Sequence, residues 1–243
     1  MCTELKSEVV EYWTGRTEAF AALRQSEYAG EKRGQWTREI LRMLPEGENL
    51  RILDAGTGTG FFSLLLGAMG HRVTGIDLTQ SMVDRARAES LRLGIPAEFL
   101  VMDAESPDFP DQTFDLVVSR NLTWNLPHLE RAYAEWLRVL KPGGRLINFD
   151  ADYCREHSPD RPLPANHAHK SVSAAQAQMY EHLKEQLLPM QQPRPEWDRI
   201  LLERCGYEDI QIDCGLSQRL YAQVDAFYNP TPMFALSARR GHC

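Results

Sequence analysis

A glycine-rich segment at residues 51–60 is the strongest sign of chemistry in the sequence. A short apolar run ends at Asp54, and glycines follow at positions 56, 58 and 60. Glycine lets the backbone turn tightly and approach a ligand without a Cβ in between. The dinucleotide fingerprint Gly-x-Gly-x-x-Gly does not fit, because its third glycine would fall on Phe61 or Ser63. The segment predicts a ligand-binding loop of another kind; a plain turn between a strand and a helix is the alternative.

Acidic residues close the next two predicted strands. Asp77 follows the loop by about 20 residues, where Rossmann-like domains place an acid on the ribose hydroxyls. A carboxylate can accept hydrogen bonds from both hydroxyls of a ribose. The alternative for Asp77 is a helix N-cap. Asp103 closes the third strand, and its alternative is a solvated acid in an acidic loop.

The elements that must position these acids alternate in type along the chain. Helical spacing predicts two helices over 7–44 and another over 174–188. Between and after them the pattern predicts strands over 51–54, 72–76, 97–101, 114–119, 145–150, 209–214 and 233–238, and helices over 61–69, 79–93, 127–140 and 196–205. We therefore expect an α/β fold: a Rossmann-like, seven-stranded, mostly parallel sheet with helices on both faces, an N-terminal helical cap and an insertion after the fifth strand.

Three parts of the chain follow from this pattern. Residues 1–47 form the helical cap, 48–151 with 196–243 form the Rossmann-like core, and 152–195 form an insertion of helix and loop that we expect to be a substrate lid. Histidines and Cys154 gather in the insertion, but their spacing matches no known ligand set. We therefore expect no metal site.

Composition narrows the class of partner. The chain has 27 basic and 34 acidic side chains, a formal charge of -7, and no dense basic patch. Nucleic-acid binders need such a patch to neutralise phosphates, so a small-molecule ligand is favoured and no nucleic acid is expected. No apolar run approaches the roughly 20 residues that span a bilayer. Five scattered cysteines favour reduced thiols, so we expect a soluble cytoplasmic protein without a membrane partner; monomer and homodimer both stay open.

Five segments resemble a known family in their order and spacing. They are the glycine loop, the Asp77 strand end, the Asp103 strand end, residues 115–124 and residues 140–147. Together they resemble the class I S-adenosylmethionine-dependent methyltransferases, in particular the methyltransferase type 11-like group that includes enzymes of ubiquinone and menaquinone biosynthesis. The resemblance covers about two fifths of the chain. It implies S-adenosylmethionine as cofactor, S-adenosylhomocysteine as product, and a small-molecule acceptor.

The same resemblance implies roles for individual residues. Asp103 would take the adenine amino group, Tyr12 and Arg16 would reach the methionine carboxylate, and Trp36 would help to close the pocket. A guanidinium suits a carboxylate because it can donate two parallel hydrogen bonds. The full expected cofactor set is Tyr12, Arg16, Trp36, Asp54, Ala55, Gly56, Thr57, Gly58, Asp77, Leu78, Met82, Asp103, Ala104, Arg120, Asn121 and Leu122.

The acceptor side is less defined by the sequence. Trp124, Asp150, Tyr153 and His157 are expected there, although Trp124 could equally pack in the core beneath the following helix. Methyl transfer from a sulfonium is an in-line displacement, and the sequence assigns no general base to it. Two rival functions stay open: a cofactor-binding subunit that transfers nothing, and a nicotinamide-dependent reductase, which the glycine spacing disfavours.

Overall fold

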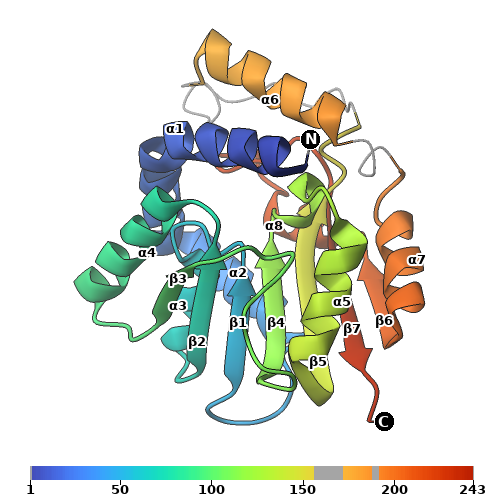
Figure 1. The fold of residues 1–243 in the computed structure, drawn as a ribbon. Helices are drawn as coiled ribbons and strands as arrows, with labels where there is room; N and C mark the ends of the chain where they lie inside the picture. The colour runs from blue at the N-terminus through green and yellow to red at the C-terminus, as the bar shows by residue number, and fades with distance from the viewer. Residues whose placement is uncertain (1, 156–171, 188–191, 243) are drawn as a thin grey trace.

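A seven-stranded sheet forms the centre of the protein (Figure 1). The computed structural model describes residues 2–155, 172–187 and 192–242. The strand order is β3-β2-β1-β4-β5-β7-β6, and only β7 runs antiparallel to its neighbours. The strands are β1 (Arg51–Ala55), β2 (Arg72–Asp77), β3 (Glu98–Val101), β4 (Phe114–Arg120), β5 (Leu140–Ala151), β6 (Tyr207–Asp213) and β7 (Met233–Arg240). The expected mostly parallel α/β sheet is confirmed.

Helices cover both faces of the sheet. They are α1 (Cys2–Ala29), α2 (Glu31–Leu41), α3 (Phe61–Gly67), α4 (Gln80–Leu93), the 3-10 helix η1 (Thr123–Asn125), α5 (Leu129–Val139), α6 (Ala174–Gln186), α7 (Glu196–Cys205) and α8 (Leu216–Leu220). Successive residues of a strand point to opposite faces. Leu53 and Val117 accordingly pack in one buried cluster, whereas their neighbours Ile52 and Leu116 pack in the other.

Two local features differ from the sequence prediction. Residues 141–144, which separate the expected helix 127–140 from the expected strand 145–150, lie inside β5, which begins at Leu140 and pairs there with Phe114. The pairing shifts its register between Phe114 and Leu116, and a proline that cannot donate to the ladder is tolerated at such an irregularity. The helix α8 was not predicted, because five residues are too few to show a helical period.

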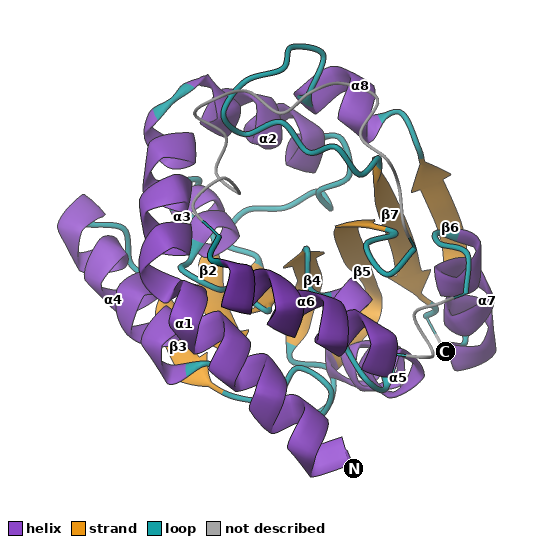
Figure 2. Cartoon of the chain, turned by 90° about the horizontal axis from the view of Figure 1, so that it is seen from above, coloured by secondary structure: helices purple, strands orange, loops and turns teal. Residues whose placement is uncertain are grey.

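The described part of the insertion rests on the N-terminal helix. Ser173 and Gln176 form a capping box at the start of α6. The Gln176 side chain donates to the Gly15 carbonyl of α1 at 3.0 Å, and Gln186 donates to Glu8 at 2.7 Å. Seen from above, α6 and α1 run side by side over the carboxyl ends of the strands (Figure 2). The division into cap, core and lid stays a prediction.

A buried ion-pair cluster fixes α1 to α2 and to the sheet. Glu27 of α1 accepts two hydrogen bonds from Arg120 of β4, at 2.7 and 3.2 Å, and one from the Trp36 indole of α2 at 2.8 Å. Arg24 pairs with the same carboxylate. Burial by itself would raise the pKa of Glu27, but the charges of Arg120 and Arg24 lower that pKa to about 2. The carboxylate is therefore ionised and anchors three elements.

The last quarter of the chain also contacts this N-terminal region. Lys32 of α2 is buried, and its ammonium group donates to the Leu220 carbonyl of α8 and pairs with Asp225 at 3.2 Å. The Lys32 ammonium group also lies 4.7 Å from the centre of the Tyr221 ring. These contacts hold the segment after α8 beside α2.

We predict that Glu27→Gln lowers the free energy of unfolding by about 3 kcal/mol at pH 7, because two guanidiniums lose their buried counterion. A carboxyl group with a lowered pKa in the folded state stabilises the protein above its unfolded pKa, and that stability is lost as the pH falls. The difference between wild type and variant should therefore shrink as the pH falls from about 4.5 to 2. Urea unfolding of both proteins at pH 7 and pH 3 measures this difference in the free energy of unfolding.

The exposed pair of Glu203 with Arg199 supplies the control. Glu203→Gln should change stability by less than about 0.5 kcal/mol at both pH values. A Glu27→Gln effect as small as this, or one equal at the two pH values, would show that the Glu27 carboxylate is not the anchor.

Candidate functional site

A cavity of about 520 Å³ opens above the carboxyl ends of the parallel strands. The loops after β1, β2, β3 and β4 form one side of it. One face of α1, part of α6 and the segment 226–231 form the other side. Open parallel sheets bind ligands at this edge, so the fold itself places the cavity where chemistry is expected.

The glycine loop is shaped by the residues on either side of it. Gly56 has a positive φ of 68°, and a Cβ at this position would lie 2.7 Å from the Leu122 side chain. Asp54 Oδ2 accepts from Thr57 Oγ1 at 2.7 Å and from the Ser63 amide at 3.0 Å. Burial raises the pKa of Asp54 to about 6. Asp54 thus holds the loop in place from beneath, although it also borders the cavity.

Asp77 stands beside this loop at the end of β2. Its Oδ2 accepts from the Gly58 amide and its Oδ1 from the Thr79 amide, both at 2.9 Å. Each carboxylate oxygen has a second lone pair, so both can still accept from a ligand. The N-cap position of α4 belongs to Thr79, so the alternative of Asp77 as N-cap is wrong. Asp77 lines the cavity, and burial raises its pKa.

Asp103 lines the cavity at the end of β3. Its Oδ2 accepts from Lys6 of α1 at 2.6 Å, and Lys6 also pairs with the fully buried Glu105. Asp103 Oδ1 accepts from the Glu105 amide at 2.9 Å. Asp103 is therefore held by α1 and by its own turn, unlike a freely solvated loop acid. Nothing in the local sequence around Lys6 indicates this role, since both of its partners lie about 100 positions away.

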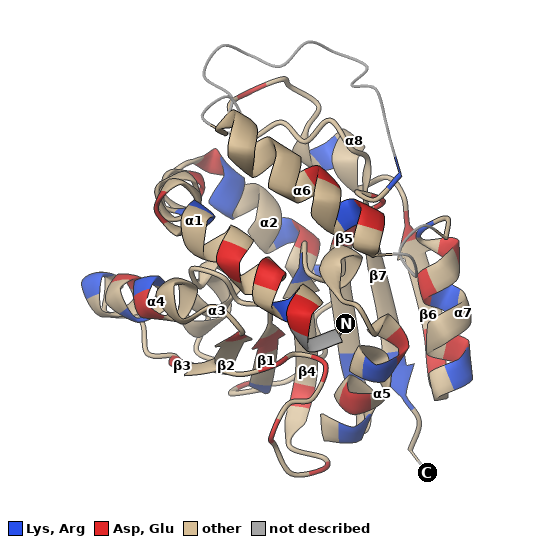
Figure 3. Ribbon diagram, turned by 45° about the horizontal axis from the view of Figure 1, so that its top comes forward, with Lys and Arg blue, Asp and Glu red and all other residues tan. Residues whose placement is uncertain are grey.

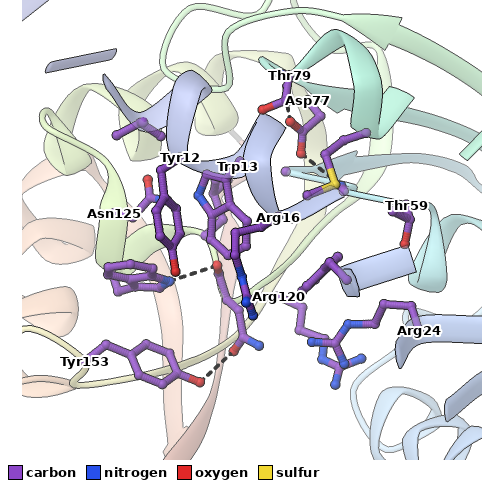
Figure 4. Close-up of a pocket in the computed structure, with 18 of the residues that line it drawn as sticks. Tyr12, Trp13, Arg16, Arg24, Thr59, Asp77, Thr79, Arg120, Asn125 and Tyr153 are labelled. Carbon is purple, nitrogen blue, oxygen red and sulfur yellow. Dashed lines mark hydrogen bonds between the residues drawn. The ribbon is translucent and has the colours of Figure 1, made fainter. Parts of the chain in front are cut away.

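One face of α1 supplies aromatic and cationic groups to the cavity. Tyr12, Arg16, Phe20 and Arg24 follow each other at intervals of four residues, which places them on one side of a helix. Arg16 is only 6% exposed, and within the described ranges of the chain its Nε has no hydrogen-bond partner. Buried polar groups are normally paired, so the unpaired guanidinium nitrogen indicates an anionic ligand. Figure 4 shows Arg16 reaching into the cavity beside Tyr12.

An aromatic cluster closes the cavity near η1. Trp124 donates its indole N–H to the Asn121 carbonyl at 3.0 Å and packs against Tyr153 and Tyr180. The Tyr153 hydroxyl donates to Asn121 Oδ1 at 3.2 Å and accepts from Asn229 Nδ2 at 2.6 Å. Trp124 lines the cavity and is 4% exposed. Its ring therefore borders the site and also packs in the core, so the two alternatives for Trp124 do not exclude each other.

Several residues that the sequence assigned to the site lie away from the cavity. Trp36 is fully buried, with its ring against Phe62 and Phe149, because its indole serves the Glu27 cluster. Ala55 is buried within β1. Asp150 is fully buried and pairs with Arg194, which leaves it no access to the cavity.

Other expected residues do line the cavity. Arg120 borders it while its guanidinium is paired with Glu27. The remaining members of the expected set that line it are Gly56, Thr57, Gly58, Leu78, Met82, Ala104, Asn121 and Leu122. Arg24, Asn229 and Tyr221 also line it and were missed. His157 lies outside the described residues.

Clusters of metal-ligating side chains and membrane-spanning helices are both absent from the described parts of the chain. Across residues 2–155, 172–187 and 192–242, no group of three or more His, Cys, Asp or Glu side chains could hold a metal ion. The Cys154 thiol instead lies 3.5 Å from the Trp124 carbonyl. In the same ranges no helix has the length and apolar character to cross a bilayer. Acidic and basic side chains are mixed along α1, α4 and α7 on the face in Figure 3.

Comparisons with known proteins agree with this geometry. A methyltransferase domain family matches residues 53–148. A phosphatidylethanolamine N-methyltransferase of Cereibacter sphaeroides is 42% identical over 101 residues, which are 40% of this chain and 48% of that protein. A demethylmenaquinone methyltransferase of Thermus thermophilus is 38% identical over 115 residues, 46% of this chain and 52% of that protein. The chain thus matches about half the length of these relatives.

Solved structures share the fold. A S-adenosylmethionine-dependent methyltransferase from Aquifex aeolicus has a TM-score of 0.57 at 21% identity, over 84% of this chain and 89% of that one. Phosphoethanolamine N-methyltransferase 2 of Haemonchus contortus has a TM-score of 0.60 at 18% identity, over 85% and 52%. The matched segment contains the glycines of the loop, Asp77 and Asp103, and the likeness to the two solved structures extends over 84% and 85% of this chain. Residues 53–148 are therefore similar in sequence to methyltransferase domains, and the chain shares the fold of these solved methyltransferase structures.

Proposed function

We propose that this protein transfers a methyl group from S-adenosylmethionine to a small-molecule acceptor. The observation that carries the proposal is the placement of charged side chains around the cavity. Two carboxylates, Asp77 and Asp103, line it at the ends of β2 and β3, and the buried, unpaired Arg16 lines it from α1. An adenosine with two ribose hydroxyls and an amino group fits the carboxylates, and an amino-acid carboxylate fits the guanidinium.

The residues present fit this cofactor in detail. Asp77 would accept from the ribose, Asp103 would accept from the adenine amino group, and Leu78 and Met82 would lie against the purine. Gly56 lets the loop pack against Leu122, because a Cβ there would lie 2.7 Å from that side chain, and the loop borders the cavity where the methionine portion would lie. Arg16 would take the carboxylate.

When bound, the sulfonium of the cofactor supplies an electrophilic methyl group. The side chains of this protein then have to align the acceptor and exclude water. The Trp124, Tyr153 and Tyr180 rings form an apolar wall suited to that task. Burial raises the pKa of Tyr153, so its hydroxyl stays protonated and serves as a hydrogen-bonding group rather than a base. No general base is assigned.

Two other functions are separated from this one by direct measurements. A non-catalytic cofactor-binding subunit would bind S-adenosylhomocysteine and give no product with a gain of one methyl group in mass spectrometry of acceptor mixtures. A nicotinamide-dependent reductase would bind NAD tightly and S-adenosylmethionine not at all. The cytoplasmic location stays a prediction, which cell fractionation tests. Monomer and homodimer both stay open, and light scattering distinguishes them.

Asp77→Ala should raise the Kd for S-adenosylhomocysteine at least about tenfold, because the ribose loses an ionised acceptor and the Gly58 amide loses its partner. Isothermal titration calorimetry measures the change. Asp108→Ala removes an exposed acid of the neighbouring loop and should leave the Kd unchanged. Equal Kd values for wild type and Asp77→Ala would remove Asp77 from the ribose site.

Arg16→Gln should weaken S-adenosylhomocysteine binding roughly tenfold to a hundredfold, as expected for the loss of a charge-assisted hydrogen bond. It should leave the binding of 5′-methylthioadenosine unchanged, because that nucleoside lacks the amino-acid portion. Arg131→Gln, at an exposed position on α5, is the matched control. Equal losses for both ligands would mean that Arg16 shapes the pocket and does not bind the carboxylate.

A further inference from the structure

Two guanidinium groups lie together in the wall of the cavity. Arg24 comes from α1 and Arg120 from the end of β4, and both side chains line the cavity. Their exposed side-chain fractions are 13% and 8%. Figure 4 shows the two guanidiniums side by side, away from Asp77 and Thr79. Like charges placed this close in a dry site need an anion between or beside them.

The protein supplies one anion for these two cations. Glu27 pairs with both Arg24 and Arg120, so the cluster keeps one net positive charge. Arg120 Nε is buried and has no hydrogen-bond partner among the residues that the structure describes. Burial, and next the charge of Arg120, lower the pKa of Arg24, which agrees with uncompensated repulsion between the two. A buried unpaired donor beside a surplus charge indicates a missing acceptor.

The other charged groups that line the cavity do not provide that acceptor. Asp54 is bonded to its own loop, and Asp77 and Asp103 lie at the ends of β2 and β3. Among the described lining residues the remaining acid is Glu181 of α6, which is 59% exposed and pairs with Lys184 at 2.8 Å. The surplus positive charge therefore faces the cavity and not a protein carboxylate.

Aromatic rings keep the two guanidiniums in place. The Arg120 guanidinium lies 4.0 Å from the centre of the Trp36 ring and 4.9 Å from that of Phe61. The Arg24 guanidinium lies 4.6 Å from the centre of Phe20. Rings stabilise a flat guanidinium by cation–π attraction and leave its N–H edge free to donate. Such a fixed edge suits the planar, two-oxygen geometry of a carboxylate or the oxygens of a phosphate.

We propose that the methyl acceptor carries an anionic oxygen group, a carboxylate or a phosphate, which binds to Arg24 and Arg120. This inference rests on the methyltransferase function proposed above. The cofactor's own carboxylate is assigned to Arg16, which lies eight residues from Arg24 and hence about 12 Å away along the helix. The body of the acceptor then lies against Tyr153, Tyr221 and Tyr228, which line the same cavity.

The test uses the full chain and four simple probes. Benzoate, phenyl phosphate, neutral methyl benzoate and cationic benzylamine are titrated by calorimetry, with and without saturating S-adenosylhomocysteine. We expect benzoate or phenyl phosphate to bind at least about tenfold more tightly than the other two probes, as one charge-assisted contact would give. The tighter of the two anions distinguishes a carboxylate from a phosphate acceptor. Equal binding of all four probes, or none by either anion, overturns the proposal.

The Arg24→Gln variant tests whether the anion binds at Arg24 and Arg120. The variant should bind the preferred anion at least about tenfold more weakly and keep the wild-type Kd for S-adenosylhomocysteine. Arg24→Lys, which retains the charge, should recover part of the anion affinity, and Arg131→Gln should behave as wild type. Thermal unfolding verifies that the variants are folded, and Arg24→Gln still leaves Glu27 paired with Arg120.

Two results would contradict this assignment in different ways. If Arg24→Gln weakens S-adenosylhomocysteine but not 5′-methylthioadenosine, the arginine pair binds the cofactor carboxylate and the acceptor proposal is wrong. If Arg24→Gln binds both anions as well as wild type does, the anion lies elsewhere. Failure of the wild type to bind S-adenosylhomocysteine would instead refute the cofactor assignment, and the titrations without it would still report on the anion site.

Discussion

The ionised carboxylate of Glu27 is the interaction on which the arrangement of the cavity depends. It receives hydrogen bonds from Trp36 on α2 and Arg120 on β4 while standing on α1 itself. Because these three elements meet at one charge, the angle of α1 over the sheet is fixed. That angle brings the face with Tyr12, Arg16 and Arg24 over the strand ends. A hydrophobic contact of similar size would tolerate sliding, whereas hydrogen-bonded charges require one geometry.

Local patterns in the sequence predicted most of the sheet and the loops at its edge. Each strand is a short apolar run bounded by turn residues, and Gly56 and Asp77 sit directly at strand ends, so their place follows from topology alone. The sixth and seventh strands and α7 were also predicted, because they repeat the same pattern. The predicted start of β5 was wrong because residues 142–144 look like a turn in sequence, and Gly143 does have a positive φ of 76°. Pairing with β4 on either side of them, at Leu140 and at Arg145, makes them an irregularity within one strand.

The residues that the sequence did not reveal act through distant partners. Arg120 and Glu27 are 93 positions apart, and nothing local to either predicts their pairing. The family resemblance placed Trp36 at the pocket, but a tryptophan on a helix above a site can face either the site or the core. Trp36 faces the core, because its indole N–H donates to Glu27 there. Asp150 likewise lies near the carboxyl end of a strand, where a catalytic acid could stand. Its partner Arg194 comes 44 positions later, and the pair is sealed in the core.

The contact of Lys32 with Leu220 and Asp225 has a consequence for how the molecule assembles. It joins residues separated by 188 positions and holds the segment that leads into 226–231, one wall of the cavity. Contacts of such long range close late, because the loop entropy must be overcome before they stabilise anything. We therefore expect the glycine loop to form with its neighbouring strands before the cavity takes its final shape. Ligand affinity would then serve as a kinetic marker for the last folding step, distinct from the recovery of helical signal.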